Sequence, residues 1–317
     1  MKMTLSKYIV LLILINCFIY PKMNVFAQQL PQYTQWTSHQ FLINPAHAGI
    51  KNCIDVHSLY RLQWLGFEGS PKSGFLTLSA PLGLKRKTIL SARQGIGARV
   101  ETDNIGPFSS TRLNIAFSNH YNFTPDTRLS LGVSAGFVQF GYNTQNSITI
   151  NPDPTATKTT SFSKFDATFG AWWNGKNYYF GLVLPNLIHA KWENIGTNSK
   201  FKSHLYLNSG YRYSINKKYT FLPSLLLKIP PAGPLVVDFN LLFDYQNQFG
   251  IGVGYRNTDA FLFLANFKIN QQFSVHYSFD LVISPMRKGT VNTHEISIIY
   301  TSCKTKNTKT TACSLFE

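Results

Sequence analysis

Apolar and polar side chains alternate along most of this chain, and this alternation constrains the fold more than any other feature. In residues 129–137, every odd position is Leu, Val, Ala or Phe, and every even position is Ser or Gly. Similar alternation occupies residues 273–280 and 294–301. Because successive side chains of a β-strand point to opposite faces, the pattern predicts strands with one apolar and one polar face.

The first residues are typical of an exported protein. Two lysines precede an apolar stretch at residues 8–20, and Val25-Phe26-Ala27 supplies the small residues that a signal peptidase recognises. We therefore expect residues 1–27 to be a signal peptide and Gln28 to be the first residue of the mature chain. A membrane-anchoring helix is the alternative, and the short apolar stretch disfavours it.

The composition favours a membrane environment. Charged residues are 14% of the chain and aromatic residues 15%, whereas a soluble domain has about 25% charged residues. No later stretch is long and apolar enough for a transmembrane helix. A closed β-barrel can still cross a bilayer, because its backbone polar groups bond to one another. A soluble sandwich with one wet face would show the same alternation.

Connection lengths favour the barrel. Short connections alternate with long ones such as residues 63–72, as expected for short periplasmic turns and longer extracellular loops. About 14 strands are predicted, and the even number places both chain termini in the periplasm and the 63–72 loop outside the cell. The predicted strands are residues 51–62, 72–81, 94–101, 110–121, 127–143, 163–174, 177–184, 203–214, 218–228, 234–244, 247–256, 260–268, 271–282 and 294–301.

Two segments flank the predicted barrel of residues 51–301. Residues 28–50 are too aromatic for a simple leader, and we expect an ordered segment that packs in the barrel mouth; a flexible periplasmic strap is the alternative. Residues 302–317 are rich in Thr and Lys and are expected to form a disordered tail.

Charge and cysteine content suggest partners but no metal centre. The formal net charge is +16, and because the export signal argues against nucleic acid, lipid phosphates or acidic partners are the candidate contacts. General solvation of turns would explain the charge equally well. Cys53, Cys303 and Cys313 remain after signal removal, without metal-ligand spacing. Cys303 and Cys313 could form a disulfide in an oxidising periplasm, and free thiols are the alternative.

An ordered set of motifs resembles the PorP/SprF family. The stretches that carry the resemblance are Gln32-Tyr33-Thr34-Gln35-Trp36, Asn44-Pro45-Ala46-His47-Ala48-Gly49, residues 60–72 (YRLQWLGFEGSPK), residues 103–109 (DNIGPFS), Phe165-Asp166-Ala167, residues 177–182, Pro185-Asn186-Leu187, Gly254-Tyr255-Arg256 and His294-Glu295-Ile296-Ser297. They cover nearly all of the mature chain. His47 stands where an aromatic residue is common, and the Cys-containing tail is not a family feature.

The resemblance implies a component of the type IX secretion system in the outer membrane of Bacteroidota. Such a protein would be a FadL-like barrel that supports export or surface attachment of adhesins, often in gliding bacteria. Its implied partners are other secretion components and a secreted adhesin or its C-terminal domain. A porin-like or FadL-like channel for small solutes is the alternative function.

We find no pattern that indicates catalysis or a cofactor, so we expect a protein that is not an enzyme. The eight histidines lack metal-ligand spacing. Residues 132–136 match the letters of a nucleophile elbow, but they lie within an alternating strand instead of at a strand-to-helix turn. His276 and three acidic residues are expected to face the lumen, where charges usually pair or line water. These acidic residues are Asp166, Asp280 and Glu295, with Arg99, Arg112 and Arg256 as possible partners.

The best candidate site combines two of these motifs. Large apolar groups in the loop at residues 63–72 are typical of a recognition surface. Alternatively, Trp64 and Phe67 fold into the barrel mouth and Glu68 bonds to Arg61 or Lys72, since apolar loop residues usually gain more from packing than from exposure. The candidate residues for partner binding or for this structural role are Asn44, Pro45, Gly49, Arg61, Trp64, Gly66, Phe67, Glu68 and Gly69.

Overall fold

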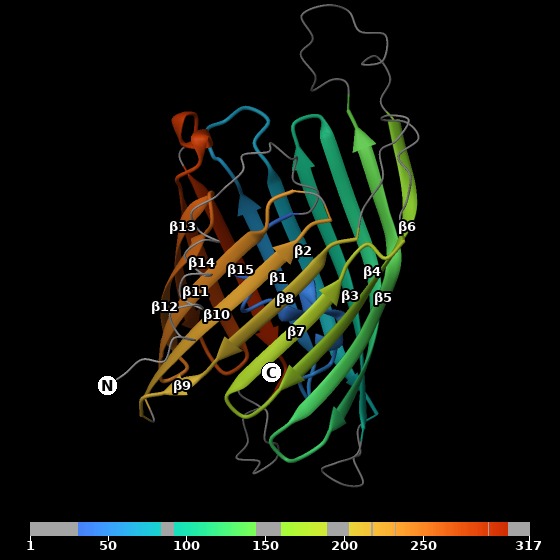
Figure 1. Cartoon of the computed structure of the whole chain (residues 1–317), viewed down its shortest axis with the longest axis vertical. Coiled ribbons are helices and arrows are strands. Elements are labelled where there is room, and N and C mark those ends of the chain that lie inside the picture. The colour runs from blue at the N-terminus through green and yellow to red at the C-terminus, as the bar shows by residue number, and fades with distance from the viewer. Residues whose placement is uncertain are drawn as a thin grey trace, which may run out of the picture.

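The structure is a computed structural model dominated by β-strands (Figure 1). It describes residues 31–83, 92–143, 160–188, 203–216, 218–231, 233–290 and 292–303. The helical elements among them are short: α2 (Gln40–Ile43), η1 (Pro45–His47) and η4 (Pro285–Lys288). Within these ranges, none of the helices has the length and hydrophobicity needed to span a membrane.

One antiparallel sheet contains all the strands and closes on itself. Each strand pairs with its neighbours in sequence, except that β8 and β9 both pair with β10, and β1 pairs with β15 to complete the ring. The strands are β1 (Asp55–Leu62), β2 (Lys72–Leu82), β3 (Arg93–Ile105), β4 (Phe108–Asn122), β5 (Arg128–Tyr142), β6 (Thr160–Asn174), β7 (Tyr178–Leu184), β8 (Leu205–Tyr211), β9 (Tyr213–Ser214), β10 (Tyr219–Ile229), β11 (Val236–Tyr245), β12 (Phe249–Arg256), β13 (Ala260–Lys268), β14 (Phe273–Val282) and β15 (Thr293–Thr301).

The fifteen strand segments form fourteen barrel strands, because β8 and β9 are two parts of one strand. Both pair with β10 in the same register. The break lies where Pro223 of β10 faces them, and proline has no N–H to donate to the ladder. Arg212, at the break, instead donates its N–H to the Asn177 oxygen at 2.7 Å. The predicted count of 14 strands is confirmed.

The outer face of the wall is apolar and the inner face is polar. On β15, Ile296 and Ile298 point outward and are 51% and 53% exposed, whereas Glu295 and Ser297 point inward and are buried. The same alternation runs through β4 and β5. An apolar outer band around a polar interior is the arrangement of a barrel that crosses a bilayer with its strands.

The barrel has two ends that differ in the segments found there. The entry end is where β1 begins and β15 ends, and the loop end carries residues 63–71, between β1 and β2. The connection predicted between the strands at residues 94–101 and 110–121 is wrong in extent. β3 and β4 continue to Ile105 and Phe108, which pair across the turn Gly106-Pro107. Gly106 adopts a φ of +55° there, which glycine tolerates without strain.

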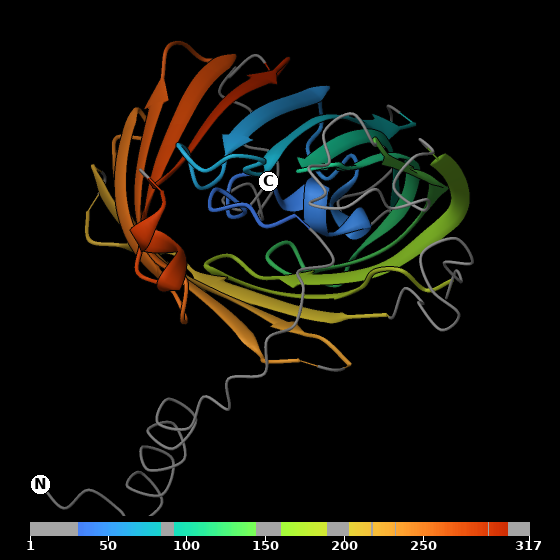
Figure 2. The same ribbon diagram turned by 90° about the horizontal axis from the view of Figure 1, so that it is seen from above.

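Residues 31–50, here called the plug, lie inside the barrel (Figure 2). Thr34 bonds to Glu295 and Asp280 in the loop-end half of the lumen, and the Ala48 oxygen accepts from Ser118 toward the entry end. The plug therefore runs along the lumen. The sequence led us to expect packing at the barrel mouth, and the plug reaches deeper than that.

A disulfide joins the chain on either side of the barrel closure. Cys53 precedes β1 and Cys303 follows β15, and they are bonded with a Cα–Cα distance of 5.3 Å. Neither alternative drawn from the sequence, a bond from Cys303 to Cys313 or a free Cys303 thiol, is therefore present. Because β1 and β15 are neighbours in the ring, the residues that flank them are brought together. Ser302 also donates its N–H to the Ile54 oxygen at 2.9 Å, so the ordered chain extends into the predicted tail; residues 304–317 lie outside the described part.

Candidate functional site: the plug, its ionic seat and the entry-end cavity

The candidate motif of residues 61–69 is divided between the lumen and the loop end. Arg61 points into the lumen and is 1% exposed. Trp64 is half-buried, has a φ of +54° and donates its N–H to Thr293 Oγ1 at 3.0 Å. Phe67 is 47% exposed, and its neighbour Glu68 is also exposed. The sequence offered Arg61 or Lys72 as alternative partners of Glu68, and Arg61 instead contacts Glu295 and Asp280.

Two glycines of this motif shape the exposed loop. Gly66 and Gly69 have φ values of +90° and +71°, which are left-handed conformations that side chains disfavour. The Gly69 oxygen accepts a hydrogen bond from Gly106 N at 2.9 Å. This bond ties the loop to the β3–β4 hairpin and leaves Leu65 and Phe67 facing outward at the loop end.

Buried charges hold the beginning of the plug. Arg61 contacts Glu295, its direct cross-strand neighbour, and Asp280 at 3.0 Å. The plug residue Thr34 donates its backbone N–H to Glu295 at 2.7 Å and its hydroxyl to Asp280 at 2.8 Å. Arg256 lies 3.5 Å from Asp280. We call these five residues the ionic seat; its charges are paired and bonded, as buried charges require.

The sequence offered three arginines as partners for the lumen carboxylates without assigning pairs, and two of them contact a carboxylate. Arg256 contacts Asp280, and Arg112 contacts Asp166 at 3.8 Å. Arg99 instead donates to the Leu42 oxygen at 2.5 Å and to Asn114. The sequence reasoning missed Asp238, Lys228 and Arg93. A signal was present for Asp238, which shares one face of β11 with Asn240 and Asp244.

Asn44 and Pro45 form the turn that fixes the middle of the plug. The Asn44 side chain accepts a bond from Ala46 N at 3.0 Å and donates to the Ala171 oxygen of β6 at 2.9 Å. Pro45 begins η1, where its fixed φ suits the first helical position. Both residues are buried against the wall, so the structure places them in plug packing.

Glycines allow the plug backbone to approach the wall closely. Gly49 has a φ of +58°, and a Cβ at this position would lie 2.4 Å from the Ala80 oxygen. Across the contact, a Cβ on Gly95 would lie 2.1 Å from the Ala48 oxygen, and one on Gly132 would lie 2.4 Å from Ala46 N. Wall and plug therefore fit only because side chains are missing on both sides.

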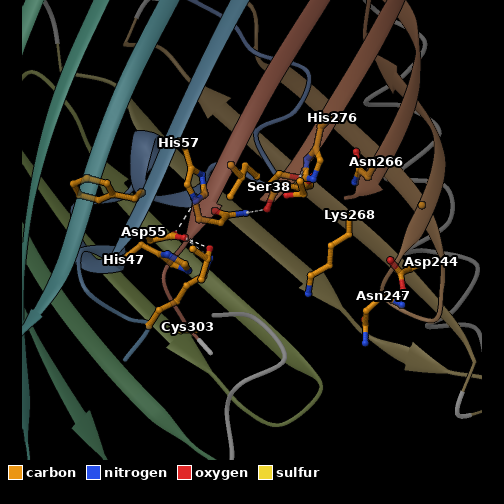
Figure 3. Close-up of a pocket in the computed structure, with 18 of the residues that line it drawn as sticks. Ser38, His47, Asp55, His57, Asp244, Asn247, Asn266, Lys268, His276 and Cys303 are labelled. Atoms are coloured by element: carbon orange, nitrogen blue, oxygen red, sulfur yellow. Dashed lines mark hydrogen bonds and ion pairs between the residues drawn. The ribbon is translucent and has the colours of Figure 1, made fainter. Parts of the chain in front are cut away.

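Histidines from the plug and the wall meet near the entry end (Figure 3). His39 Nδ1 lies 2.9 Å from His57 Nδ1, and His57 Nε2 lies 2.7 Å from Asp55, which also binds Lys51 at 2.8 Å. Burial lowers the pKa of His39 well below its usual range, and His57, His276 and Lys51 lower it further. Within the described ranges, no group of three or more His, Cys, Asp or Glu residues is arranged to hold a metal.

A cavity of about 1340 Å³ lies beside the plug and reaches the entry end. Its lining includes the plug residue Ser38, His276, and amide side chains such as Asn247, Asn266 and Gln271 (Figure 3). None of the ionic-seat residues lines it. In the described part of the chain, the lumen is therefore divided between the plug and this cavity, which lies toward the entry end.

These features define an outer-membrane β-barrel whose lumen holds its own N-terminal segment. Residues 25–300 match the family described as type IX secretion system membrane protein PorP/SprF. The chain belongs to this family, so the resemblance drawn from the sequence motifs is confirmed. No curated protein matches the chain in sequence.

Solved structures with a similar architecture are outer-membrane proteins. Omp33 of Acinetobacter baumannii is 8% identical, with a TM-score of 0.48, and the match covers 80% of this chain and 99% of Omp33. A FadL homologue of Pseudomonas aeruginosa is 10% identical, with a TM-score of 0.44 and coverage of 86% and 94%. The toluene transporter TodX of P. putida is 10% identical, with a TM-score of 0.45 and coverage of 82% and 92%.

Proposed function

We propose that this protein is a non-enzymatic accessory of type IX secretion that supports export or surface attachment of an adhesin. Membership of the PorP/SprF family supports a role in the secretion system. The adhesin would be recognised at the loop end, and other secretion components would bind at the entry end. The protein acts by binding in this proposal, and no chemical step is required of it.

The exposed loop at residues 63–71 is the observation that carries the proposal. Leu65 and Phe67 are 38% and 47% exposed at the loop end, in the connection beyond the strands of the apolar outer wall. Arg287 and Lys288 of η4 are exposed at the same end, and Gly289 lies close to the Phe67 ring. Apolar groups beside cations are typical of a recognition surface.

The orientation follows from the lengths of the connections. Entry-end turns such as residues 175–177 and 246–248 are short, and the loop-end connections include residues 63–71 and 283–292. Outer-membrane barrels place short turns in the periplasm and long loops outside the cell. The loop end would therefore meet exported protein, and the entry end would meet periplasmic components.

Deletion of the gene tests the function. We expect loss of one adhesin from the cell surface, measured by surface proteomics, with uptake of small solutes unchanged. Complementation with the full-length chain should restore the adhesin. Impaired uptake with normal surface proteins would favour a small-solute channel and would contradict the proposal.

Substitution of the exposed loop residues tests the binding surface. We expect Leu65→Ala with Phe67→Ala to reduce adhesin recovery at least tenfold, because about 2 kcal/mol is a usual hot-spot contribution. Heat-modifiable migration should stay normal, since both side chains are exposed. Phe263→Ala on the outer wall is the matched control, because it removes an exposed Phe (45% exposed) away from the loop end. Equal recovery from both variants would contradict the role of this surface.

A further inference from the structure

We propose that the entry-end cavity binds an extended polypeptide segment of a periplasmic partner. This inference rests on the proposed function, because it names how the entry end would engage another secretion component. Three features of the lumen carry it: the way the wall holds the plug, the composition of the open part, and the closure of the cavity toward the loop end.

The wall already binds polypeptide backbone along the plug. Glu295 accepts the N–H groups of Thr34 and Gln35 at 2.7 and 3.1 Å. Ser118 donates to the Ala48 oxygen at 2.6 Å, and Arg99 donates to the Leu42 oxygen at 2.5 Å. Polar side chains of the barrel wall thus satisfy main-chain groups that a strand or helix would normally satisfy. The lumen is therefore suited to holding an irregular peptide.

The cavity presents side chains of the same kind, and no segment of the described part of the chain lies in front of them. Amide and hydroxyl side chains dominate its polar lining: Ser224, Asn247, Gln248, Asn266, Gln271 and Ser274. The Asn266 Oδ1 atom is buried and has no hydrogen-bond partner among the described residues. An amide both donates and accepts, so it can bond to either group of a peptide unit.

Charge does not dominate this site. Of the charged residues lining the cavity, Lys51 is paired with Asp55 at 2.8 Å, and Asp244 accepts the Asn247 N–H at 2.8 Å. Lys268 stands at the mouth and is exposed (Figure 3). Opposite charges thus largely cancel, which favours recognition of neutral peptide groups over binding of an ionic solute.

Size and closure also favour a peptide over a small transported solute. The cavity of about 1340 Å³ exceeds the roughly 300–1,000 Å³ of a typical small-molecule pocket. It reaches the entry-end turns through Asn247 and Gln271, but its lining includes neither Arg61 nor Glu295. The cavity is therefore open at the entry end and ends before it reaches the ionic seat. A peptide segment would enter and leave it at the entry end.

A photo-crosslinking experiment in cells tests the contact. A benzophenone amino acid replaces Asn266, which faces the cavity, or Phe263 of the same strand, which faces outward, is 45% exposed and does not line the cavity. We expect position 266 to crosslink to one segment of a type IX component, identified by mass spectrometry of the digested adduct. Position 263 should not give that adduct. Only intramolecular adducts at 266, or the same adducts at both positions, would overturn the proposal.

Filling the cavity provides the second test. We expect Asn266→Trp with Ser274→Trp to reduce recovery of that component at least tenfold, whereas Phe263→Trp, outside the cavity lining, leaves recovery unchanged. Heat-modifiable migration in all variants controls for barrel folding. If the filled variant recovers the component normally, the cavity proposal fails, although the deletion phenotype would still support the proposed function. Reduced small-solute uptake with normal recovery of the component would also overturn it.

Discussion

Arg61 and Glu295 are direct cross-strand partners on β1 and β15, the first and last strands of the barrel. Their side chains meet in the lumen and are 1% and 0% exposed. Glu295 also accepts two N–H groups of the plug. The same contact therefore links closure of the barrel to the position of the N-terminal segment.

Removal of the Arg61 charge should destabilise the closed, plugged barrel. Arg61→Met leaves Glu295 and Asp280 as two buried carboxylates without their nearest cation. Breaking a buried pair in this way costs about 3–5 kcal/mol. We expect a matching decrease in the free energy of unfolding, measured by urea titration in lipid vesicles.

The double variant separates the charge effect from packing. Arg61→Met with Glu295→Gln removes both charges of the pair, so it should cost less than the sum of the single changes. Lys72→Met, at an exposed position of β2, should change stability by less than about 0.5 kcal/mol. A loss below 1 kcal/mol for Arg61→Met would show that this contact does not support closure.

A methyl group on the wall should expel the plug. In Gly132→Ala, the added Cβ would lie 2.4 Å from Ala46 N, a distance that real contacts do not reach. We expect residues 31–50 to lose hydrogen-exchange protection while the strands keep theirs. Gly250→Ala is the control, because its Cβ would have no neighbour closer than 3.4 Å. Normal plug protection in Gly132→Ala would contradict the close packing described here.

The features that could be predicted from the sequence are those set by local pattern. Alternation defines each strand by itself, so the fourteen strands were found with small errors in their ends. The error at residues 103–109 arose because DNIGPFS contains turn-forming residues. In the structure only Gly106-Pro107 forms the turn, and Asp103 remains in β3, where it accepts a bond from Ser73 at 2.6 Å.

The features that could not be predicted depend on pairing across the ring. Arg61 was grouped with the candidate motif although it lies in the predicted strand 51–62, and its partner Glu295 was not identified because it lies 234 positions away in the sequence. Cys53 and Cys303 meet for the same reason, with a separation of 250. The polar side of each strand was evident, but the partner of each polar residue depends on register and on the path of the plug. Neither is encoded in a local window.

The disulfide should be detectable and should contribute to stability. We expect a digest without reductant to contain a peptide that links Cys53 to Cys303. Cys303→Ser should lower the free energy of unfolding by about 3 kcal/mol, because the bond closes a long loop of the unfolded chain. The variant should still form a barrel, since β1 and β15 remain paired. A Cys303–Cys313 peptide in the digest would contradict the structure.

Acidification should loosen the plug through His39. Its pKa is lowered in the plugged state, chiefly by burial and then by His57 and His276, whereas a free histidine titrates near 6.5. The released plug therefore binds a proton more readily, so the plugged state is fully stable above about pH 6.5 and loses stability as the pH falls below it. Hydrogen exchange of residues 31–50, corrected for intrinsic rates, should be faster at pH 5 than at pH 7.5. His39→Gln should remove most of this difference. His294 bonds to the exposed Tyr277, so His294→Gln should retain the difference. The same pH dependence in both variants would show that another group controls the plug.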